Sequence, residues 1–370
     1  MKNVLSIVSY QFLPAKMGGQ KGIAFFNLFF CKQVNFTCIT TKNNDPYCAE
    51  GYELRNILSN SKFRYINLFY FFTLRRIVKE KNITHIVLEH PYYGWLGILL
   101  KYFCNISLVV HSHNIESERF KSIGKWWWRI LAYYEKLTYK SADTCFFIND
   151  EDKEYAVQYF NLEKHKCTTI TYGFELSEPP SSQEKTIAKN FLQSKYKIDV
   201  QDKLLLFNGT LNYKPNLEAL EIILKKITPV LLNNTNFKYT IIICGKNLPA
   251  AYDELNEYRD KNIIFAGFVD DISPYFKGVD IFINPVIEGG GIKTKIVEAL
   301  GYNLSVVSTK SGAVGIPVSI TGEKMIIIAD NDWILFANKI ITININSSIP
   351  AIYFEHFYWN NIALKAARNI

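Results

Sequence analysis

The sequence predicts an α/β protein made of two doubly wound domains, each with a parallel sheet covered by helices. Its 370 residues exceed what one hydrophobic core usually fills. In both halves, short runs rich in β-branched and aromatic residues alternate with helical patterns. The alternation stops at residues 173–203, where Pro179, Pro180 and several serines follow one another, and it then starts again.

The first half begins with a β-rich run and continues as strand, helix, strand. Extended runs are typical of strands, and apolar residues spaced three and four apart are typical of helices. The expected strands are 4–10, 34–40, 84–90, 106–114 and 144–150, and the expected helices are 20–33, 72–81, 94–103, 126–141 and 151–160. Residues 1–175 therefore form the first predicted domain.

The same alternation returns after residue 203. The expected strands are 203–209, 238–245, 262–268, 280–285 and 304–309, with helices from 216 and over 293–301. We assign residues 176–202 to a linker and residues 203–350 to the second domain. Residues 351–370 have an amphipathic helical pattern.

Composition excludes several classes of protein. Apolar residues make up 48% and charged residues 21%, as in folded chains. The 7 cysteines are scattered and form no CxxC pair, which argues against a disulfide framework and a zinc site and favours a reducing compartment. The apolar run at the N-terminus is too short for a secretory signal, and no run reaches the ~18 residues of a membrane span.

Positive charge is concentrated in the first half. Residues 1–180 carry 22 Lys and Arg against 16 Asp and Glu, which gives +6 of the overall +8. A charge of +8 spread over 370 residues does not indicate nucleic-acid binding.

The segment GKWWWRILAYYEKLTYK (124–140) combines aromatic rings and cations on one predicted helix. Such a helix suits an anionic membrane interface, and aromatic core packing is the alternative.

The segment EGGGIKTKIVEALGYN (288–303) predicts an anion site. Three consecutive glycines follow a predicted strand and precede a helix, so backbone N–H groups can converge there. Lys293 and Lys295 add positive charge, and Lys295 and Glu298 stand one helical turn apart. A flexible turn followed by a surface Lys–Glu pair is the alternative.

Three segments resemble glycosyltransferase family 4, whose members are retaining enzymes of the GT-B fold. NPVIEGGGIKTKIVEALGYNLSVVSTKSGAVGI (284–316) is similar to the donor-site signature of that family. FNGTLNYKPNLEAL (207–220) and NIIFAGFVDDISPYFKGVDIFINP (262–285) resemble its glycine loop and its nucleotide-binding stretch, in the same order. The resemblance implies two Rossmann-like domains facing a cleft, with a C-terminal helix that crosses back to the first.

The resemblance also implies roles for single residues. Glu298 would hold the ribose hydroxyls, and the backbone around Gly291 and Lys293 would hold the diphosphate. The expected donor-binding residues are Gly209, Thr210, Lys214, Phe268, Val269, Gly290, Gly291, Ile292, Thr294 and Glu298, and the expected catalytic residues are His113, Lys293 and Lys295.

The chain departs from the family pattern at two places. The first acid of the family's glutamate pair falls on Gly290, and Glu288 is out of register with it. The Arg and Lys that many members place after the loop glycine are replaced by Thr210 and Asn216. The phosphate-binding cations are therefore expected to be Lys293, Lys295 and Lys214.

The acceptor side is expected in the first domain. In VVHSHNIESER (109–119), His111 and His113 alternate along a predicted strand and so face the same side, and His113 with Asn114 resembles the family's cleft histidine. Structural histidines are the alternative.

Two further segments bear on the chemistry. PAKMGGQKG (14–22) supplies Gly18 and Gly19 to a loop that the family places beside donor and acceptor, or to a plain tight turn. It lacks the GxGxxG of nicotinamide enzymes. Asp150 and Asp152 form a DxD, but Asn149 and Asp150 stand where a strand passes into a helix and are interpreted as caps, so no metal is expected.

These features predict an enzyme that moves a sugar from a nucleotide sugar, UDP- or GDP-linked, to a hydroxyl of a glycan or lipid-linked acceptor with retention. The family implies bacterial surface polysaccharide synthesis, with no cofactor beyond the donor. We expect a cytoplasmic protein, peripheral on the inner face of the plasma membrane. The alternative is a catalytically impaired nucleotide-sugar-binding or scaffold subunit.

Overall fold

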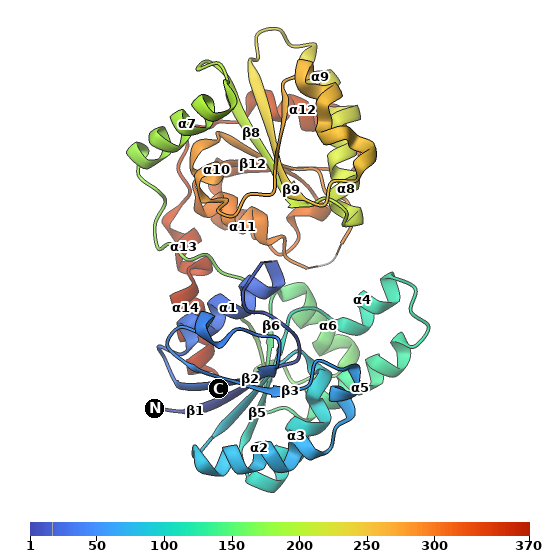
Figure 1. Ribbon diagram of the computed structural model, residues 1–370. Coiled ribbons are helices and arrows are strands. Elements are labelled where there is room, and N and C mark those ends of the chain that lie inside the picture. The colour runs from blue at the N-terminus through green and yellow to red at the C-terminus, as the bar shows by residue number, and fades with distance from the viewer. Residues whose placement is uncertain (17, 290) are drawn as a thin grey trace. The chain divides into compact units, whose positions relative to one another are not determined.

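The computed structural model describes every residue except Met17 and Gly290. The chain forms two compact units (Figure 1). The first consists of Met1–Glu175 together with His356–Ile370, and the second of Leu176–Glu355. The end of the chain thus belongs to the first unit.

The first unit contains a parallel sheet of 7 strands in the order β3-β2-β1-β4-β5-β6-β7. Sequential strands lie on both sides of β1, so the direction of winding reverses between β1 and β4, where doubly wound folds bind ligands. The strands are β1 (Asn3–Val8), β2 (Asn35–Thr41), β3 (Glu53–Leu58), β4 (His85–Glu89), β5 (Ser107–Ser112), β6 (Thr144–Phe147) and β7 (Cys167–Thr169).

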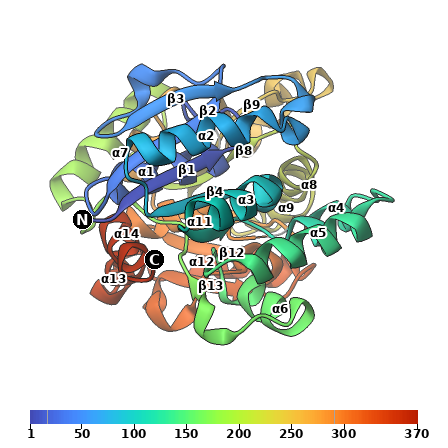
Figure 2. The ribbon, with the colours of Figure 1, turned by 90° about the horizontal axis from the view of Figure 1, so that it is seen from below.

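Helices cover both faces of this sheet (Figure 2). One face packs against α2 (Phe69–Glu80), α3 (Gly94–Cys104), α5 (Trp128–Ser141) and α6 (Asp150–Phe160) in a continuous apolar core. Alternate residues of the strands point to the other face, where α1 (Gly18–Phe30) packs with α14 (Trp359–Arg368). Between β5 and α5 lies the short helix α4 (Glu116–Ser122).

The second unit repeats the arrangement with 6 parallel strands in the order β10-β9-β8-β11-β12-β13, so the winding reverses between β8 and β11. The predicted fold of two doubly wound α/β domains is confirmed. The strands are β8 (Lys203–Thr210), β9 (Tyr239–Lys246), β10 (Ile263–Gly267), β11 (Ile281–Asn284), β12 (Ser305–Thr309) and β13 (Met325–Ile328).

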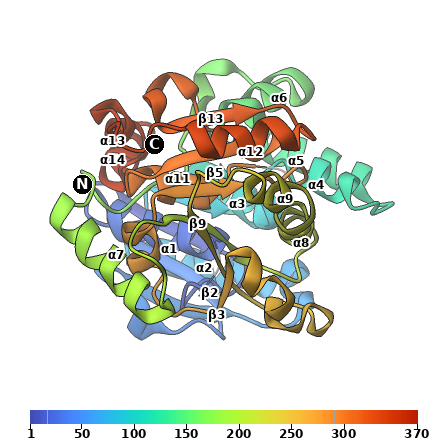
Figure 3. The ribbon, with the colours of Figure 1, turned by 90° about the horizontal axis from the view of Figure 1, so that it is seen from above.

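Two sets of helices cover this second sheet. Helices α8 (Lys214–Ile222), α9 (Thr228–Leu232) and α12 (Trp333–Thr342) pack on the face to which Ile281 and Ile283 point (Figure 3). A π-helical segment, Ile223–Ile227, joins α8 to α9. Phe282 points to the other face, where it meets Phe276 of α10 (Ser273–Gly278), and α11 (Thr294–Gly301) follows β11.

The predicted linker is largely a helix. Residues 176–202 contain α7 (Ser182–Tyr196), which begins with a capping box between Ser181 and Glu184. It packs on α10 so closely that a Cβ on Gly278 would lie 2.7 Å from the backbone oxygen of Ala188. Pro179 and Pro180 come just before this helix, and α7 belongs to the second unit.

The C-terminal segment also differs in detail from the single helix expected over 351–370. It forms α13 (Ala351–Phe357) and α14, with an extended residue, Tyr358, between them. At this break the chain pairs with Phe174, whose N–H donates to Phe357 O at 2.6 Å and whose oxygen accepts from Trp359 N–H at 3.0 Å. These hydrogen bonds attach the end of the chain to the first unit.

Candidate active site

The expected donor residues gather at the carboxyl ends of β8 and β11, the two strands at which the second sheet reverses its winding. Gly209 and Thr210 end β8, and Gly291 and Ile292 lie in the loop that leads from β11 to α11. Phe268 and Val269 follow β10 at the same edge, with Phe268 exposed. Gly290 lies outside the described residues.

Gly209 brings the β8 loop into direct contact with the start of α8. A Cβ on Gly209 would lie 2.7 Å from the side-chain nitrogen of Asn216, which donates a hydrogen bond to Thr210 O at 3.1 Å. A larger residue at 209 would therefore displace Asn216. This close approach is the physical reason for a glycine at the end of the strand.

Lys295 crosses from α11 to this loop. Its Nζ donates to Asn208 O and to Asn216 Oδ1, both at 3.3 Å, and lies over the ring of Phe207. Burial, together with the smaller effect of the nearby Lys293, lowers the pKa of Lys295 to about 7. The structure thus places a poorly solvated amine beside the glycine loop.

Lys293 occupies the N-cap position of α11. Its Nζ donates to Gly289 O at 2.5 Å and to Gly291 O at 3.0 Å, and burial lowers its pKa to about 8. Among the described residues, no side chain caps α11, which begins at Thr294, so backbone N–H groups of its first turn can bind another acceptor. Glu298 lies half-buried one turn further along.

Lys214 is placed differently from the other two lysines. Its exposed Nζ forms ion pairs with Glu288 at 3.0 Å and with Glu218 at 3.4 Å. The side chain of Glu288, the conspicuous acid before the glycines, therefore faces a lysine of α8. Both carboxylates offset the charge that Lys214 could offer to a phosphate.

On the first unit, His111 and His113 contact the same carboxylate. Glu89 ends β4 and pairs in register with His111 of β5. Its Oε2 lies 3.1 Å from His111 Nδ1 and 2.6 Å from His113 Nε2. The two rings therefore face one side, as their alternation predicts. Phe26 of α1 covers His111, with ring centroids 4.9 Å apart.

A second imidazole–carboxylate pair lies beside the first. His90 Nδ1 is 3.1 Å from Glu116 Oε1, and its other ring nitrogen, Nε2, is 3.1 Å from the hydroxyl of Tyr10. The His90 ring stacks on His113 with centroids 4.5 Å apart. The sequence analysis did not identify Glu89, His90 or Glu116 as site residues. Glu89 and His90 stand at the end of the expected strand 84–90, where ligands bind in doubly wound sheets, so their position could have indicated them.

His90 has a backbone conformation that is rare for a residue with a side chain, φ 68° and ψ 158°. Such a conformation costs on the order of 1–3 kcal/mol and concentrates at functional sites. Its N–H donates to His111 O at 2.9 Å, which holds the strained residue against β5. The residue in this rare conformation is also the one whose ring stacks on His113.

Glu135 of α5 accepts hydrogen bonds from the backbone at the start of α4. Its two carboxylate oxygens accept the backbone N–H groups of Glu116 and Ser117 at 2.9 and 2.8 Å. Burial raises the pKa of Glu135 to about 7. An acid of the tryptophan-rich segment therefore supports the histidine cluster.

The remaining expected residues of the first unit are Gly18, Gly19 and Asn114. Gly18 begins α1, and a Cβ on Gly19 would meet no heavy atom within 4 Å, so packing does not require that glycine. Asn114 accepts a hydrogen bond from Ser112 Oγ at 2.8 Å through its backbone oxygen.

The DxD acids serve α6. Asn149 caps this helix by accepting the N–H of Asp152 at 2.6 Å, and Asp150 pairs with Lys153 at 2.6 Å. Burial raises the pKa of Asp152 to about 6. The position of Asn149 agrees with its interpretation as a cap, whereas Asp150 is the first residue of the helix and pairs with Lys153 instead of capping it.

Many large apolar side chains of the first unit are exposed. On the tryptophan-rich segment, the exposed fractions are 82% for Trp126, 66% for Ile130 and 67% for Tyr133. A second group, which the sequence reading missed, lies before and on α2 and at the end of α3: Phe63, Ile66, Leu68, Phe69, Phe72, Tyr102 and Phe103. Among the described residues, no helix combines the length and apolarity that a membrane crossing requires.

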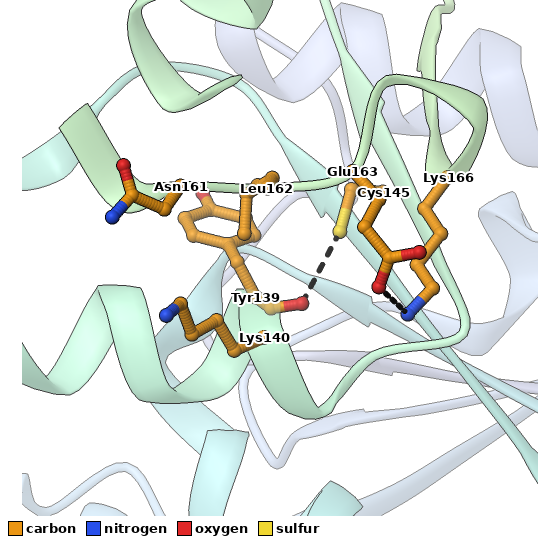
Figure 4. Close-up of a pocket in the computed structure, with 7 residues that line it drawn as sticks. All are labelled: Tyr139, Lys140, Cys145, Asn161, Leu162, Glu163 and Lys166. Carbon is orange, nitrogen blue, oxygen red and sulfur yellow. Dashed lines mark hydrogen bonds and ion pairs between the residues drawn. The ribbon is translucent and has the colours of Figure 1, made fainter. Parts of the chain in front are cut away.

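A cavity of about 200 Å³ lies elsewhere in the first unit (Figure 4). Tyr139, Cys145 and Leu162 line it, together with the ion pair of Lys166 and Glu163. None of the expected donor or acceptor residues lines this cavity.

Two family models match the chain, one over each half. Residues 32–178 match the model described as Glycosyltransferase Family 4, and residues 202–345 match that described as Glycosyl transferases group 1. A Klebsiella pneumoniae protein, described as an uncharacterized 44.6 kDa protein in the cps region, is 32% identical over 169 residues. That match covers 44% of this chain and 42% of the relative, less than half of its length.

Solved structures are similar over nearly the whole chain. A glycosyltransferase from Rickettsia africae matches 99% of this chain and 97% of its own, with a TM-score of 0.73 and 15% identity. Alr3699/HepE from Anabaena, in complex with UDP, matches 99% of this chain and 98% of its own, with a TM-score of 0.73 and 13% identity. The same protein in complex with UDP-glucose gives a TM-score of 0.70 and 14% identity, covering 100% of this chain and 99% of its own. At such identities the likeness concerns the fold.

Proposed function

Since the chain belongs to the family 4 type of GT-B glycosyltransferases, we propose that it transfers a sugar from a nucleoside diphosphate sugar to a hydroxyl of a glycan or lipid-linked acceptor, with retention. One observation carries this proposal. The amine of Lys295 forms hydrogen bonds with the loop around Gly209, and α11, on which Lys295 lies, begins without a side-chain cap among the described residues. A helix start and buried amines together suit a diphosphate.

The chemistry of the proposed step depends on charge at the leaving group. As the bond to the sugar breaks, the nucleoside diphosphate gains negative charge. The N–H groups of α11, Lys293 and Lys295 would stabilise that charge without a metal, and removal of one such preorganised group typically lowers kcat by ~10²–10³. Glu298 would bind the ribose hydroxyls.

A UDP-sugar is the proposed donor, with a GDP-sugar as the other candidate. The UDP and UDP-glucose complexes of HepE, a protein of the same fold, support UDP. We propose bacterial surface polysaccharide synthesis as the process, supported by the cps-region relative from Klebsiella.

The exposed aromatic and basic residues of the first unit support a place at the membrane surface. Trp126 and Ile130 are exposed beside Lys121, Lys125 and Arg129. Rings and aliphatic chains can enter the headgroup region while cations bind anionic lipid. The proposed location is the inner face of the plasma membrane, where lipid-linked acceptors are accessible.

Calorimetric titration with UDP, GDP and ADP tests the donor side, followed by hydrolysis of the corresponding sugars. We expect one nucleotide to bind and its sugar to be hydrolysed slowly by the wild type and far more slowly by Lys295→Ala. Lys226→Ala, at an exposed lysine of the second unit, should behave as wild type. Failure of all three nucleotides to bind would contradict the proposal.

One observation favours a second candidate, a nucleotide-sugar-binding subunit without catalysis. Lys214 is engaged by two carboxylates, and Thr210 and Asn216 occupy positions where many relatives carry cations. Tight nucleotide binding without turnover of any donor, with or without glycan acceptors, would identify this candidate.

A further inference from the structure

We propose that Glu89 is a positioning residue that holds His113 with its Nε2–H inward, so that His113 Nδ1 serves as the hydrogen-bond acceptor for a sugar hydroxyl. The inference rests on the proposed glycosyl transfer and assigns to that reaction a carboxylate that the sequence did not indicate. Its basis is the contact of one buried carboxylate with two imidazoles.

The first step of the argument is the direction of the hydrogen bonds. The Glu89 side chain is fully buried, and an ionised carboxylate only accepts hydrogen bonds. The ring nitrogens that face it, His113 Nε2 at 2.6 Å and His111 Nδ1 at 3.1 Å, must therefore carry the protons. The two donors bring the pKa of Glu89 below its usual range, although burial alone would raise it.

The second step is the state of the other nitrogen. Burial lowers the pKa of His113 to about 4, and neighbouring His90 acts in the same direction, so the ring is neutral at pH 7. A neutral imidazole carries one proton, which is the one directed to Glu89. His113 Nδ1 therefore keeps its lone pair, and it takes no hydrogen-bond partner within the part of the chain that the structure describes.

The third step separates His113 from its neighbours. His111 Nε2 also has a lone pair, but it is buried without a partner, whereas the His113 side chain is 9% exposed. His113 follows the end of β5 at the carboxyl edge of the sheet, where ligands bind in doubly wound folds. The stacked ring of His90 limits its rotation. Only His113 thus combines a lone pair, access and a fixed orientation among these three histidines.

Glu89 and the two histidines could also be considered as metal ligands, but their distances fit a bound cation less well than a hydrogen bond. Zinc ligands lie ~2.0–2.2 Å from the ion in a tetrahedron, which places them roughly 3.4 Å apart. The 2.6 Å between Glu89 Oε2 and His113 Nε2 is the length of a charge-assisted hydrogen bond. We therefore interpret this cluster as a hydrogen-bonded one.

Nitrogen-15 NMR of His113 in the free protein at pH 7 tests the tautomer directly. We expect a protonated Nε2 and an unprotonated Nδ1. Glu89→Gln removes the negative charge that both ring N–H groups face and puts an NH₂ group in place of one carboxylate oxygen. The preference of His113 for the Nε2–H tautomer should therefore weaken. We expect a His113 Nδ1–H population to appear together with a kcat lowered ~10²-fold and an unchanged nucleotide affinity. Glu80→Gln, at an exposed acid of α2, is the matched control.

Two substitutions of His113 provide an independent readout. The amide of His113→Asn reaches the Nδ1 position, whereas that of His113→Gln reaches the Nε2 position and keeps the contact with Glu89. We expect His113→Asn to retain more kcat than His113→Gln. A protonated Nδ1 in the wild type, or full kcat in Glu89→Gln, would overturn the inference even if the protein is an active transferase. Absence of transfer in a wild type with the expected tautomer would instead count against the proposed function.

Discussion

The amine of Lys295 lies 3.3 Å from the side-chain oxygen of Asn216 and so attaches α11 to the beginning of α8. Asn216 occupies the position at which the family resemblance places a phosphate-binding lysine. The positive charge thus reaches the same loop from a different helix. Under the proposed function, Lys295 would supply beside Asn216 the cation that the family resemblance places at position 216.

We expect Lys295→Met to weaken nucleoside diphosphate binding by about 10- to 150-fold. Hydrogen bonds to charged groups contribute ~1.5–3 kcal/mol, which converts to this range. Calorimetric titration measures the change, and Lys226→Met provides an exposed lysine of the same unit as control. Wild-type affinity in Lys295→Met would show that the diphosphate binds elsewhere.

The same substitution should not destabilise the unliganded protein at pH 7. The pKa of Lys295 is about 7 in the folded chain and near 10.4 when unfolded, so the unfolded chain binds more protons between these values. Stability therefore rises with pH across that window, and the wild type is penalised at its lower end. We expect the Tm of Lys295→Met to equal or exceed the wild-type Tm at pH 7, with a smaller gain at pH 9. A lower Tm at pH 7 would contradict this.

Nucleotide binding should weaken as pH rises. Under the proposed function, the diphosphate would bind the protonated forms of Lys293 and Lys295, whose pKa values in the free protein are about 8 and 7. Above pH 8 binding must be accompanied by uptake of a proton, so the Kd should increase between pH 8 and 9.5. Titrations in buffers of different ionisation enthalpy measure the proton uptake, which should decrease in Lys295→Met.

Much of the fold could be predicted because the central strands are covered on both faces. Tyr239–Lys246 and Lys203–Thr210 are continuous apolar runs of the kind that parallel sheets bury. The edge strand Glu53–Leu58 has a mixed, half-buried pattern, and Cys167–Thr169 has only 3 residues, so neither gave a periodic signal. Because Pro179 and Pro180 are typical of loops, residues 176–202 were assigned to a linker and α7 was not predicted.

The donor side was partly visible in the sequence because Lys293, Lys295 and the glycines are neighbours in one segment. The contact of Glu89 with His113 joins residues 24 positions apart and depends on the pairing of β4 with β5. The contact of Lys295 with Asn216 spans 79 positions. Such contacts follow from sheet order and helix placement, which local patterns do not encode.

Trp359→Ala should destabilise the first unit by roughly 3–5 kcal/mol, the usual cost of truncating a buried tryptophan. The Trp359 ring is almost fully buried against Tyr172, and a Cβ on Gly173 would lie 2.4 Å from it. Denaturant unfolding monitored by fluorescence measures the loss. Arg368→Ala, exposed in the last turn of α14, should leave stability nearly unchanged.

The exposed aromatic residues predict binding to anionic membranes. Trp126→Ser combined with Ile130→Ser should reduce co-sedimentation with vesicles that contain phosphatidylglycerol, because each exposed side chain loses the apolar area that enters the interface. Lys121, Lys125 and Arg129 add about 1 kcal/mol each near an anionic surface, so binding should weaken with salt and be absent on pure phosphatidylcholine. Ile187→Ser, which removes an exposed isoleucine of α7 in the second unit, is the matched control. Equal binding of the double variant and this control would assign the exposed side chains of Trp126 and Ile130 to another partner.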